Sequence, residues 1–514
     1  MFKIFLSIAI VVIIIVITLY YYLIKNYNYW RKRKVTGPSP QLIFGNTKKS
    51  SLLETTISEC IKNIYDNYPD EPYVGIYELR TPVLLLRNPE IIKLVLIKDF
   101  SHFQGRGIAM NENSDPLSAN LINLTGTKWR TLRTKLTPAF TSGKIKNMFE
   151  MFVDSSNKFR KFVVKFADAE ETVEFRDLAA KFTTDIISTC CFGLETNTIQ
   201  DNDSEFRSMC RKVLDPSLTI GLKRLVRWYL PGLFKYLQMS LTPIEVSNYF
   251  MNLVKNMIDY RIANNYHRND ILQLLMKLKD HKLSIDDNNN HDFDDKHSDI
   301  IIDDRTIAAQ AYIFLLAGFE TSSTTMSFTM FELAVNQEIQ QKVYEEIIEK
   351  IKKYGKLSWD AIAEMEYLDC VIRETLRKHP PVGLVPRVCN EDYILPTTNL
   401  VIEKGVTVLI PIHAIHHDPK YYKNPEKFDP DRFFMDKNNN KHRDCVFLPF
   451  GAGPRICIGY RFAHAQTKAG IVALLIDYKV SLGKNMAPTL DYDPIANILT
   501  NKLGIWLKIN WRNK

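Results

Sequence analysis

The sequence predicts a mainly α-helical chain with a small β-sheet region, an α+β class, and one membrane-spanning helix at the amino terminus. Three observations lead to this prediction. Residues 4–24 carry no charge, and residues 148–271 and 305–335 have long helical patterns with short breaks. Only short stretches, chiefly 72–96 and 401–412, show the alternating or β-branched pattern of strands. The length of 514 residues alone would allow two to four domains.

Residues 1–25 form the predicted anchor. At ~1.5 Å per residue, the segment Ile4 to Ile24 spans about 31 Å, which matches a bilayer core of ~30 Å. A cleavable signal peptide is the alternative, but its apolar region would be shorter and would end at small residues. Only Lys3 precedes the segment, so the basic residues after it place the bulk of the protein in the cytosol. These are Lys25, Arg31, Lys32, Arg33 and Lys34.

Residues 26–40 form a predicted basic and proline-containing hinge, and residues 41–514 form the predicted main domain. Gly37-Pro38-Ser39-Pro40 cannot continue a helix. The net charge of +9 includes no basic stripe interleaved with aromatic residues, which argues against a nucleic-acid-binding protein. The eight cysteines form no CxxC pair, so we expect reduced thiols and no disulfide framework.

Three further segments have a distinctive composition. Residues 214–241 are apolar but broken by prolines and glycines, so they form either a core helix pair or an amphipathic segment at a membrane surface. Residues 286–304 are rich in Asn and Asp and resemble a solvated insertion between helices. Residues 100–124 have the composition of a loop.

Three helical motifs carry candidate functional groups. Trp129 and Arg133 are four residues apart, and Glu374 and Arg377 three apart, so each pair shares a helix face. Gly318 lies inside the helix predicted for 305–335 and costs ~1 kcal/mol against alanine. It therefore indicates either close packing against another helix or a local bulge beside a ligand. The adjacent residues Glu320 and Thr321 are an acid and a hydroxyl, but such a pair in a helix is usually structural.

The segment 450–459 contains Cys457, three glycines and a proline, and a helix is predicted directly after it. The glycines allow the backbone to approach a flat group closely. Backbone N–H groups at a helix start favour a thiolate over a thiol. A thiolate presented in this way is suited to ligate a haem iron. Taken alone, Cys457 would be one of eight scattered cysteines.

These motifs together resemble the cytochrome P-450 family of haem-thiolate monooxygenases, in its microsomal, membrane-anchored form. The pattern Phe-x-x-Gly-x-Arg-x-Cys-x-Gly at 450–459 matches at every fixed position, and Ala-Gly-x-Glu-Thr, Glu-x-x-Arg and Trp-x-x-x-Arg occur in the family's order. The continuation at 136–144 is most similar to the insect detoxification-type group. The departures are the lean hinge, the 286–304 insertion and Asp431 in place of a glutamate.

The resemblance implies the cytochrome P-450 fold, a haem b cofactor and specific roles for residues. Cys457 would be the axial ligand of the iron. Four donors would hold the haem propionates: Trp129, Arg133, Arg387 and Arg455, with Arg106 as a weaker candidate. Thr321 and Glu320 would deliver protons to bound O₂. Glu374, Arg377 and Arg432 would form a buried structural brace behind the cysteine loop.

The resemblance also implies insertion of one oxygen atom of O₂ into a lipophilic small molecule, either a hormone-like lipid or a xenobiotic. The expected pocket comprises residues from about 105–125, 210–245, 310–321 and 380–386. No GxGxxG fingerprint is present, so electrons from NADPH would come through a flavoprotein reductase, with cytochrome b5 as an additional partner, at the endoplasmic reticulum membrane. An acidic partner would dock on the basic residues Lys128, Arg130, Lys135, Lys441 and Arg443. The alternatives are a peroxide-rearranging isomerase or dehydratase of the same fold, and a non-catalytic haem-binding membrane protein.

Overall fold

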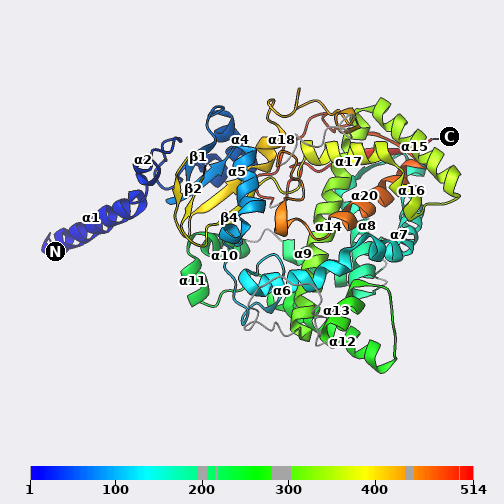
Figure 1. Cartoon of the computed structure of the whole chain (residues 1–514), viewed down its shortest axis with the longest axis horizontal. Coiled ribbons are helices and arrows are strands. Elements are labelled where there is room, and N and C mark those ends of the chain that lie inside the picture. The colour runs from blue at the N-terminus through cyan, green and yellow to red at the C-terminus, as the bar shows by residue number, and fades with distance from the viewer. Residues whose placement is uncertain are drawn as a thin grey trace.

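The computed structural model describes residues 2–512 apart from 195, 197, 200–204, 215–217, 281–301, 397, 435–444 and 497. The described chain is mainly helical, with three small sheets beside the helices (Figure 1). Its α-helices are α1 (Phe2–Ile24), α2 (Tyr29–Lys32), α3 (Lys48–Ser51), α4 (Ile57–Asp66), α5 (Pro89–Lys93), α6 (Gly126–Leu136), α7 (Ser142–Ala169), α8 (Phe175–Phe192), α9 (Glu205–Leu214), α10 (Leu218–Tyr229), α11 (Pro231–Tyr236), α12 (Ile244–Ala263), α13 (Ile271–Asp280), α14 (Asp304–Val335), α15 (Gln337–Tyr354), α16 (Trp359–Ala363), α17 (Glu366–Lys378), α18 (Ile412–His416), α19 (Asp431–Phe434) and α20 (Tyr460–Leu475).

The largest sheet has the strand order β1-β2-β7-β4 and lies at the end of the body from which α1 projects (Figure 1). β1 and β2 are antiparallel, β2 and β7 are parallel, and β4 and β7 are antiparallel. A second sheet has the order β3-β9-β8, and β5 pairs with β6. The strands are β1 (Tyr73–Glu78), β2 (Thr81–Leu86), β3 (Thr172–Glu174), β4 (Val385–Val388), β5 (Tyr393–Ile394), β6 (Val401–Ile402), β7 (Thr407–Ile410), β8 (Tyr478–Leu482) and β9 (Trp506–Trp511).

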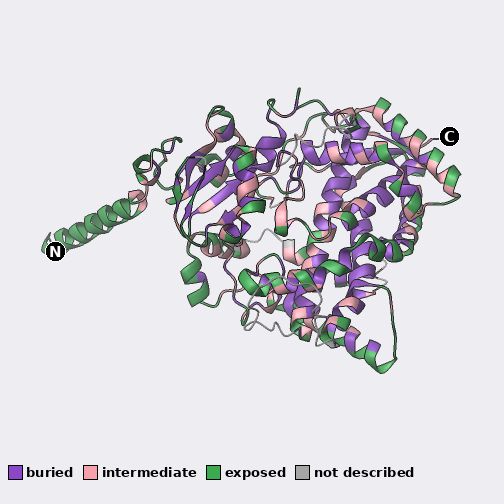
Figure 2. Cartoon of the chain, in the orientation of Figure 1, coloured by how far each residue is buried: buried purple, intermediate pink, exposed green. Residues whose placement is uncertain are grey.

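Helix α1 extends away from the body and is exposed except at its carboxyl-terminal end (Figure 2). Among the described residues it is the single helix that is long and apolar enough to cross a membrane. Its length and exposure agree with the predicted anchor. In the segment predicted as a basic and proline-containing hinge, Trp30 and Val35 are buried against the body.

The predicted strand region 72–96 is only partly correct. The second strand of the region, β2, ends at Leu86, and the chain then forms α5. Asn88 caps this helix by accepting from the backbone N–H of Glu90, and Pro89 occupies the first helical position. A π-helical turn, Leu94–Lys98, follows. The cap and the proline outweigh the strand propensity of the later Ile and Leu residues. Conversely, β3 interrupts the predicted helical region because it pairs with β9, some 330 residues further along the chain.

Helix α14 runs through the middle of the body, packed against α8, α12 and α20. It is an uninterrupted α-helix at Gly318, where an added Cβ would lie 2.7 Å from Cδ1 of Ile187 on α8. The glycine therefore permits close helix packing, and the alternative of a bulge is not observed.

The segment 214–241 forms α10 and α11, and its large apolar side chains Leu222, Leu225 and Trp228 are 45–62% exposed. This exposure contradicts a core helix pair and leaves the alternative of a surface segment. Residues 286–301 of the Asn- and Asp-rich segment lie outside the described part of the chain.

Candidate active site

The cysteine loop approaches the rest of the protein very closely. Gly453 has φ +70°, and an added Cβ would lie 1.8 Å from the carbonyl oxygen of Leu96, so only glycine fits this position. The N–H of Cys457 donates to the carbonyl of Phe450 at 2.9 Å, and α20 begins three residues later. These contacts hold Cys457 at the wall of a cavity of about 300 Å³.

Three parts of the chain meet at this cavity. Cys457 lies on one wall, and Ala317, Gly318 and Thr321 of α14 line it as well. Trp129 and Arg133 reach it from one face of α6, as their spacing predicts. Of the expected pocket segments, 105–125, 310–321 and 380–386 contribute lining residues, whereas the described residues of 210–245 contribute none.

Four arginines converge on the cavity with no carboxylate among its described lining residues: Arg106, Arg133, Arg387 and Arg455. Arg387 on β4 is 1% exposed and Arg455 is 4% exposed, and the Nε of each is buried without a hydrogen-bond partner. Arg455 otherwise donates to the carbonyl of Leu124 at 2.6 Å, and its guanidinium lies 4.2 Å from the Trp129 ring centre. A buried cation without a counter-ion is costly, so this arrangement calls for an anionic ligand.

The electrostatics of the four arginines support the same conclusion. Burial, with smaller contributions from the charges of Arg106, Arg387 and Arg133, lowers the pKa of Arg455 to about 8. Burial and Arg106 together lower the pKa of Arg387 to about 9. Burial lowers the pKa of Arg106 to about 10. A macrocycle with two carboxylates fits this cluster, because guanidinium groups bind carboxylates in a bidentate manner.

The surroundings of Cys457 favour a thiolate less than the helix start alone would predict. Burial raises its pKa, while the backbone N–H of Gly459 and the charges of Arg133 and Arg106 act in the opposite direction. Of the eight free cysteines, Cys457 is the single one with a large accessible surface, and this surface faces the cavity inside the protein. Coordination to a metal ion deprotonates a thiol, so the residues present fit a haem iron at this position.

The acid and the hydroxyl of α14 lie on different sides of the helix. Thr321 lines the cysteine cavity, and its hydroxyl donates to the carbonyl of Ala317 at 2.6 Å. Glu320 is 8% exposed and instead lines a second cavity, where its carboxylate pairs with Arg176 of α8. Sequence reasoning did not find Arg176, because no local spacing relates it to Glu320.

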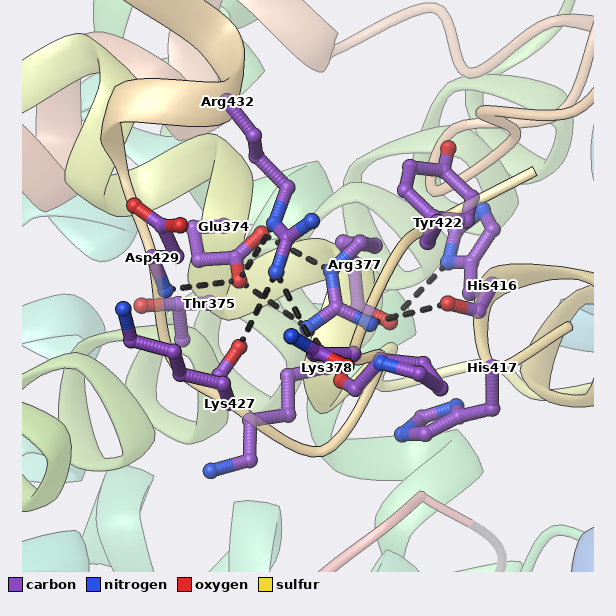
Figure 3. A network of polar contacts seen from close by, with 12 residues as sticks. Glu374, Thr375, Arg377, Lys378, His416, His417, Tyr422, Lys427, Asp429 and Arg432 are labelled. Carbon is purple, nitrogen blue, oxygen red and sulfur yellow. Dashed lines mark hydrogen bonds and ion pairs between the residues drawn. The ribbon is translucent and has the colours of Figure 1, made fainter. Parts of the chain in front are cut away.

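The predicted brace is present and buried (Figure 3). Glu374 and Arg377 are both 0% exposed and share two hydrogen bonds of 2.8 and 2.9 Å. Arg432 donates to Glu374 at 3.1 Å, so the second arginine joins as expected. Arg377 also donates to the carbonyl of His416 at 2.9 Å, and Nε2 of His416 accepts from the N–H of Leu448. The brace is thus linked to the segment that leads into the cysteine loop.

One polar residue near the loop was not anticipated. His464 on α20 lines the cysteine cavity and packs on Phe450 with a ring-centre distance of 5.3 Å. Burial lowers its pKa to about 4, so it is neutral at physiological pH. Of the predicted docking residues, Lys128 and Arg130 are exposed on α6, and Lys441 and Arg443 lie outside the described residues.

Comparison with known proteins agrees with this geometry. The sequence model of the family "Cytochrome P450" matches residues 35–509. The probable cytochrome P450 6a14 of Drosophila melanogaster is 39% identical over 495 residues, which cover 95% of this chain and 96% of that protein. Cytochrome P450 6B2 of Helicoverpa armigera is 37% identical, with 94% of each chain covered. Cytochrome P450 6B1 of Papilio polyxenes is 36% identical over 94% of this chain and 95% of its own.

The family model covers most of the chain, the relatives match it nearly end to end, and the predicted resemblance to insect members is confirmed. The cavity contains the features that a haem with two propionates and a thiolate ligand requires. The chain therefore belongs to the cytochrome P450 family and is a haem-thiolate monooxygenase that uses haem and O₂.

Proposed function

We propose that this enzyme inserts one oxygen atom of O₂ into a lipophilic small molecule, a hormone-like lipid or a xenobiotic, with electrons from an NADPH-dependent flavoprotein reductase. The observation that carries the proposal is the cavity in which Cys457, four arginines without a carboxylate and Thr321 meet. Bound haem supplies oxygen activation, with the thiolate donating electron density to the iron. The remaining steps depend on side chains of the chain itself.

Five side chains bind and orient the cofactor in this proposal. Cys457 ligates the iron, and Trp129, Arg133, Arg387 and Arg455 hold the two propionates. Arg106 contributes a further positive charge, since it lines the same cavity and donates to the carbonyl of Ile122 at 2.8 Å. Pairing with carboxylates would compensate the burial that lowers the pKa values of these arginines, together with the mutual repulsion that adds to the shift at Arg387 and Arg455.

Glu320 and Thr321 carry protons across α14. Glu320 takes up a proton in the second cavity, beside Arg176, Asp177 and Asp493. Thr321 lies one residue further along the helix, with its hydroxyl in the cysteine cavity. Transfer requires Glu320 to leave its ion pair with Arg176 and swing around the helix, and the hydroxyl of Thr321 to release the carbonyl of Ala317. This arrangement keeps the proton supply separate from the apolar side of the cavity.

The walls of the cavity support a lipophilic substrate. Most of the lining side chains are apolar, among them Leu121, Ile313, Phe314 and Val382. A mostly apolar pocket with few polar groups is typical of sites for small hydrophobic molecules. Thr321 at the cavity supports a monooxygenase over a peroxide-rearranging isomerase, because family members of the latter kind often lack this hydroxyl.

The cellular setting is proposed from the sequence and α1. The single apolar helix followed by basic residues supports an endoplasmic reticulum anchor with a cytosolic body. Lys128 and Arg130 with Lys135 supply positive charge on α6 for an acidic reductase or cytochrome b5. If charge reversal at these lysines and arginine leaves reduction by the reductase unchanged at low salt, this docking surface is wrong.

The CO-difference spectrum of the reduced holoenzyme tests the axial ligand. We expect wild type and the control Cys60→Ala, a buried cysteine remote from the cavity lining, to show the red-shifted Soret band of a haem thiolate. Cys457→Ala should lose that band. Retention of the thiolate-type band in Cys457→Ala would overturn the assignment. Turnover of a lipid hydroperoxide without NADPH, together with no oxidation in the presence of reductase, would replace the monooxygenase proposal by the isomerase alternative.

A further inference from the structure

The segment after the anchor packs closely on the sheet. Trp30 is 3% exposed, its indole Nε1 donates to the carbonyl of Ile76 at 2.9 Å, and its backbone N–H donates to the hydroxyl of Tyr77 at 3.1 Å. An added Cβ at Gly75 of β1 would lie 2.5 Å from Cγ of Trp30. The indole therefore occupies the space that a side chain at this strand position would fill.

A second contact joins the same segment to the turn between β6 and β7. The hydroxyl of Tyr29 donates to Glu403 at 2.9 Å, and Arg33 forms an ion pair with the same carboxylate. The Arg33 guanidinium also lies 3.6 Å from the centre of the Tyr29 ring. Since Trp30 binds β1 and Glu403 precedes β7, the segment is attached to the sheet at two separate points.

The carboxyl-terminal end of α1 makes a third contact. Arg80, in the turn between β1 and β2, lies 3.7 Å from the centre of the Tyr22 ring and donates to the Tyr22 carbonyl at 3.3 Å. Between this contact and Trp30, the carbonyl of Tyr27 accepts from the hydroxyl of Tyr77. Both arms of the bend between α1 and α2 are therefore held by the body.

The proline-containing stretch cannot act as a hinge either. The N–H of Gly75 donates to the carbonyl of Thr36 at 2.8 Å, and an added Cβ at Gly37 would lie 1.9 Å from the carbonyl oxygen of Gly75. The stretch also comes after Trp30 and after the residues that contact Glu403. Since the chain is already attached to the sheet before the stretch begins, bending there cannot reorient α1. The charged residues of the segment other than Arg33 lie on the outside: Lys25, Arg31, Lys32 and Lys34 are exposed.

We propose that residues 22–35 form a rigid elbow that fixes the angle between the anchor and the catalytic body. The inner aromatic face holds the sheet, and the outer basic face meets anionic lipid headgroups, which attract exposed lysines and arginines. Because β4 of the same sheet carries Arg387, the elbow also fixes the orientation of the cofactor cavity relative to the bilayer. This inference rests on the proposed membrane attachment.

The test uses the full-length holoenzyme in oriented bilayers of phosphatidylcholine and phosphatidylserine. Polarised absorption of the haem band reports the haem tilt and its spread. We expect a strong dichroism in wild type and a loss toward the isotropic value in Trp30→Ala and in the milder pair Glu403→Gln and Tyr29→Phe. Lys404→Gln, an exposed neighbour of Glu403, is the matched control and should keep the wild-type dichroism.

Flotation with vesicles of the same lipids separates the two ways in which the test can fail. Full-length protein that does not float with vesicles overturns the proposed membrane attachment, and the elbow with it. Protein that floats but shows isotropic absorption in wild type overturns the elbow alone. Unchanged dichroism in both Glu403→Gln and Tyr29→Phe also overturns it, and this outcome can be read even if Trp30→Ala does not fold.

Discussion

Replacing Glu374 by glutamine tests the buried brace most directly. The substitution keeps the shape of the side chain but removes the charge that compensates Arg377, whose side chain is 0% exposed. Arg377 would keep its bonds to the carbonyls of His416 and Pro425, at 2.9 and 2.7 Å, but would lose its counter-ion. Glu374 also accepts from Arg432 and from the backbone N–H of Asp429.

Breaking a buried ion pair by neutralising one partner costs about 3–5 kcal/mol, because the remaining charge stays buried without compensation. Domains are stable by only about 5–15 kcal/mol, so Glu374→Gln should remove about a fifth or more of the free energy of unfolding. The loss should appear early at the cysteine loop, since His416 joins Arg377 to Leu448. The thiolate-type CO band should therefore disappear at a lower urea concentration than in wild type.

Urea titration of the holoenzyme, followed by both the CO band and circular dichroism, measures this effect. The matched control is Asp360→Asn, which breaks the exposed ion pair with Lys146 and should cost less than about 1 kcal/mol. If the free energy of unfolding of Glu374→Gln lies within about 1 kcal/mol of wild type while the control behaves as expected, the brace does not stabilise the fold.

Three further predictions concern pH, proton delivery and cofactor binding. Burial lowers the pKa of His413 and of His416 to about 3, well below the unfolded value of about 6.5, so the folded state binds fewer protons in acid. Their contribution to stability is complete above about pH 6.5 and is lost as the pH falls, by roughly 3 kcal/mol for the pair at pH 5.5. Chemical unfolding at pH 7.5 and 5.5 measures this loss. If the free energy of unfolding of His416→Gln falls with pH as steeply as that of wild type, the prediction is contradicted. Thr321→Ala and Glu320→Gln should each lower product formed per NADPH by about tenfold or more, with peroxide released instead. The control Thr329→Ala, on the same helix but outside the cavity lining, should stay near wild type. Arg387→Leu should speed haem transfer to apomyoglobin by about tenfold or more, and an unchanged rate would remove Arg387 from the propionate donors.

Several features were predictable because they depend on local spacing. The apolar run of α1, the shared helix faces of Trp129 with Arg133 and of Glu374 with Arg377, and the motif around Cys457 are all properties of a few consecutive residues. The long helix α14 follows from an uninterrupted helical pattern with Asp303 as its cap. Where two local signals compete, as at 87–98, the cap Asn88 and Pro89 prevailed over the apolar run.

By itself, the sequence determined the family and the reaction class and predicted the anchor and the axial cysteine, because these depend on residue types at fixed short spacings. Only the tertiary structure decided how distant residues meet. It brings Arg106 and Arg387 together in one cavity, pairs Glu320 with Arg176 across two helices, and attaches Trp30 to β1, where a hinge was expected. Such contacts join residues tens to hundreds of positions apart, and they arise from the packing of whole elements, which no local pattern encodes.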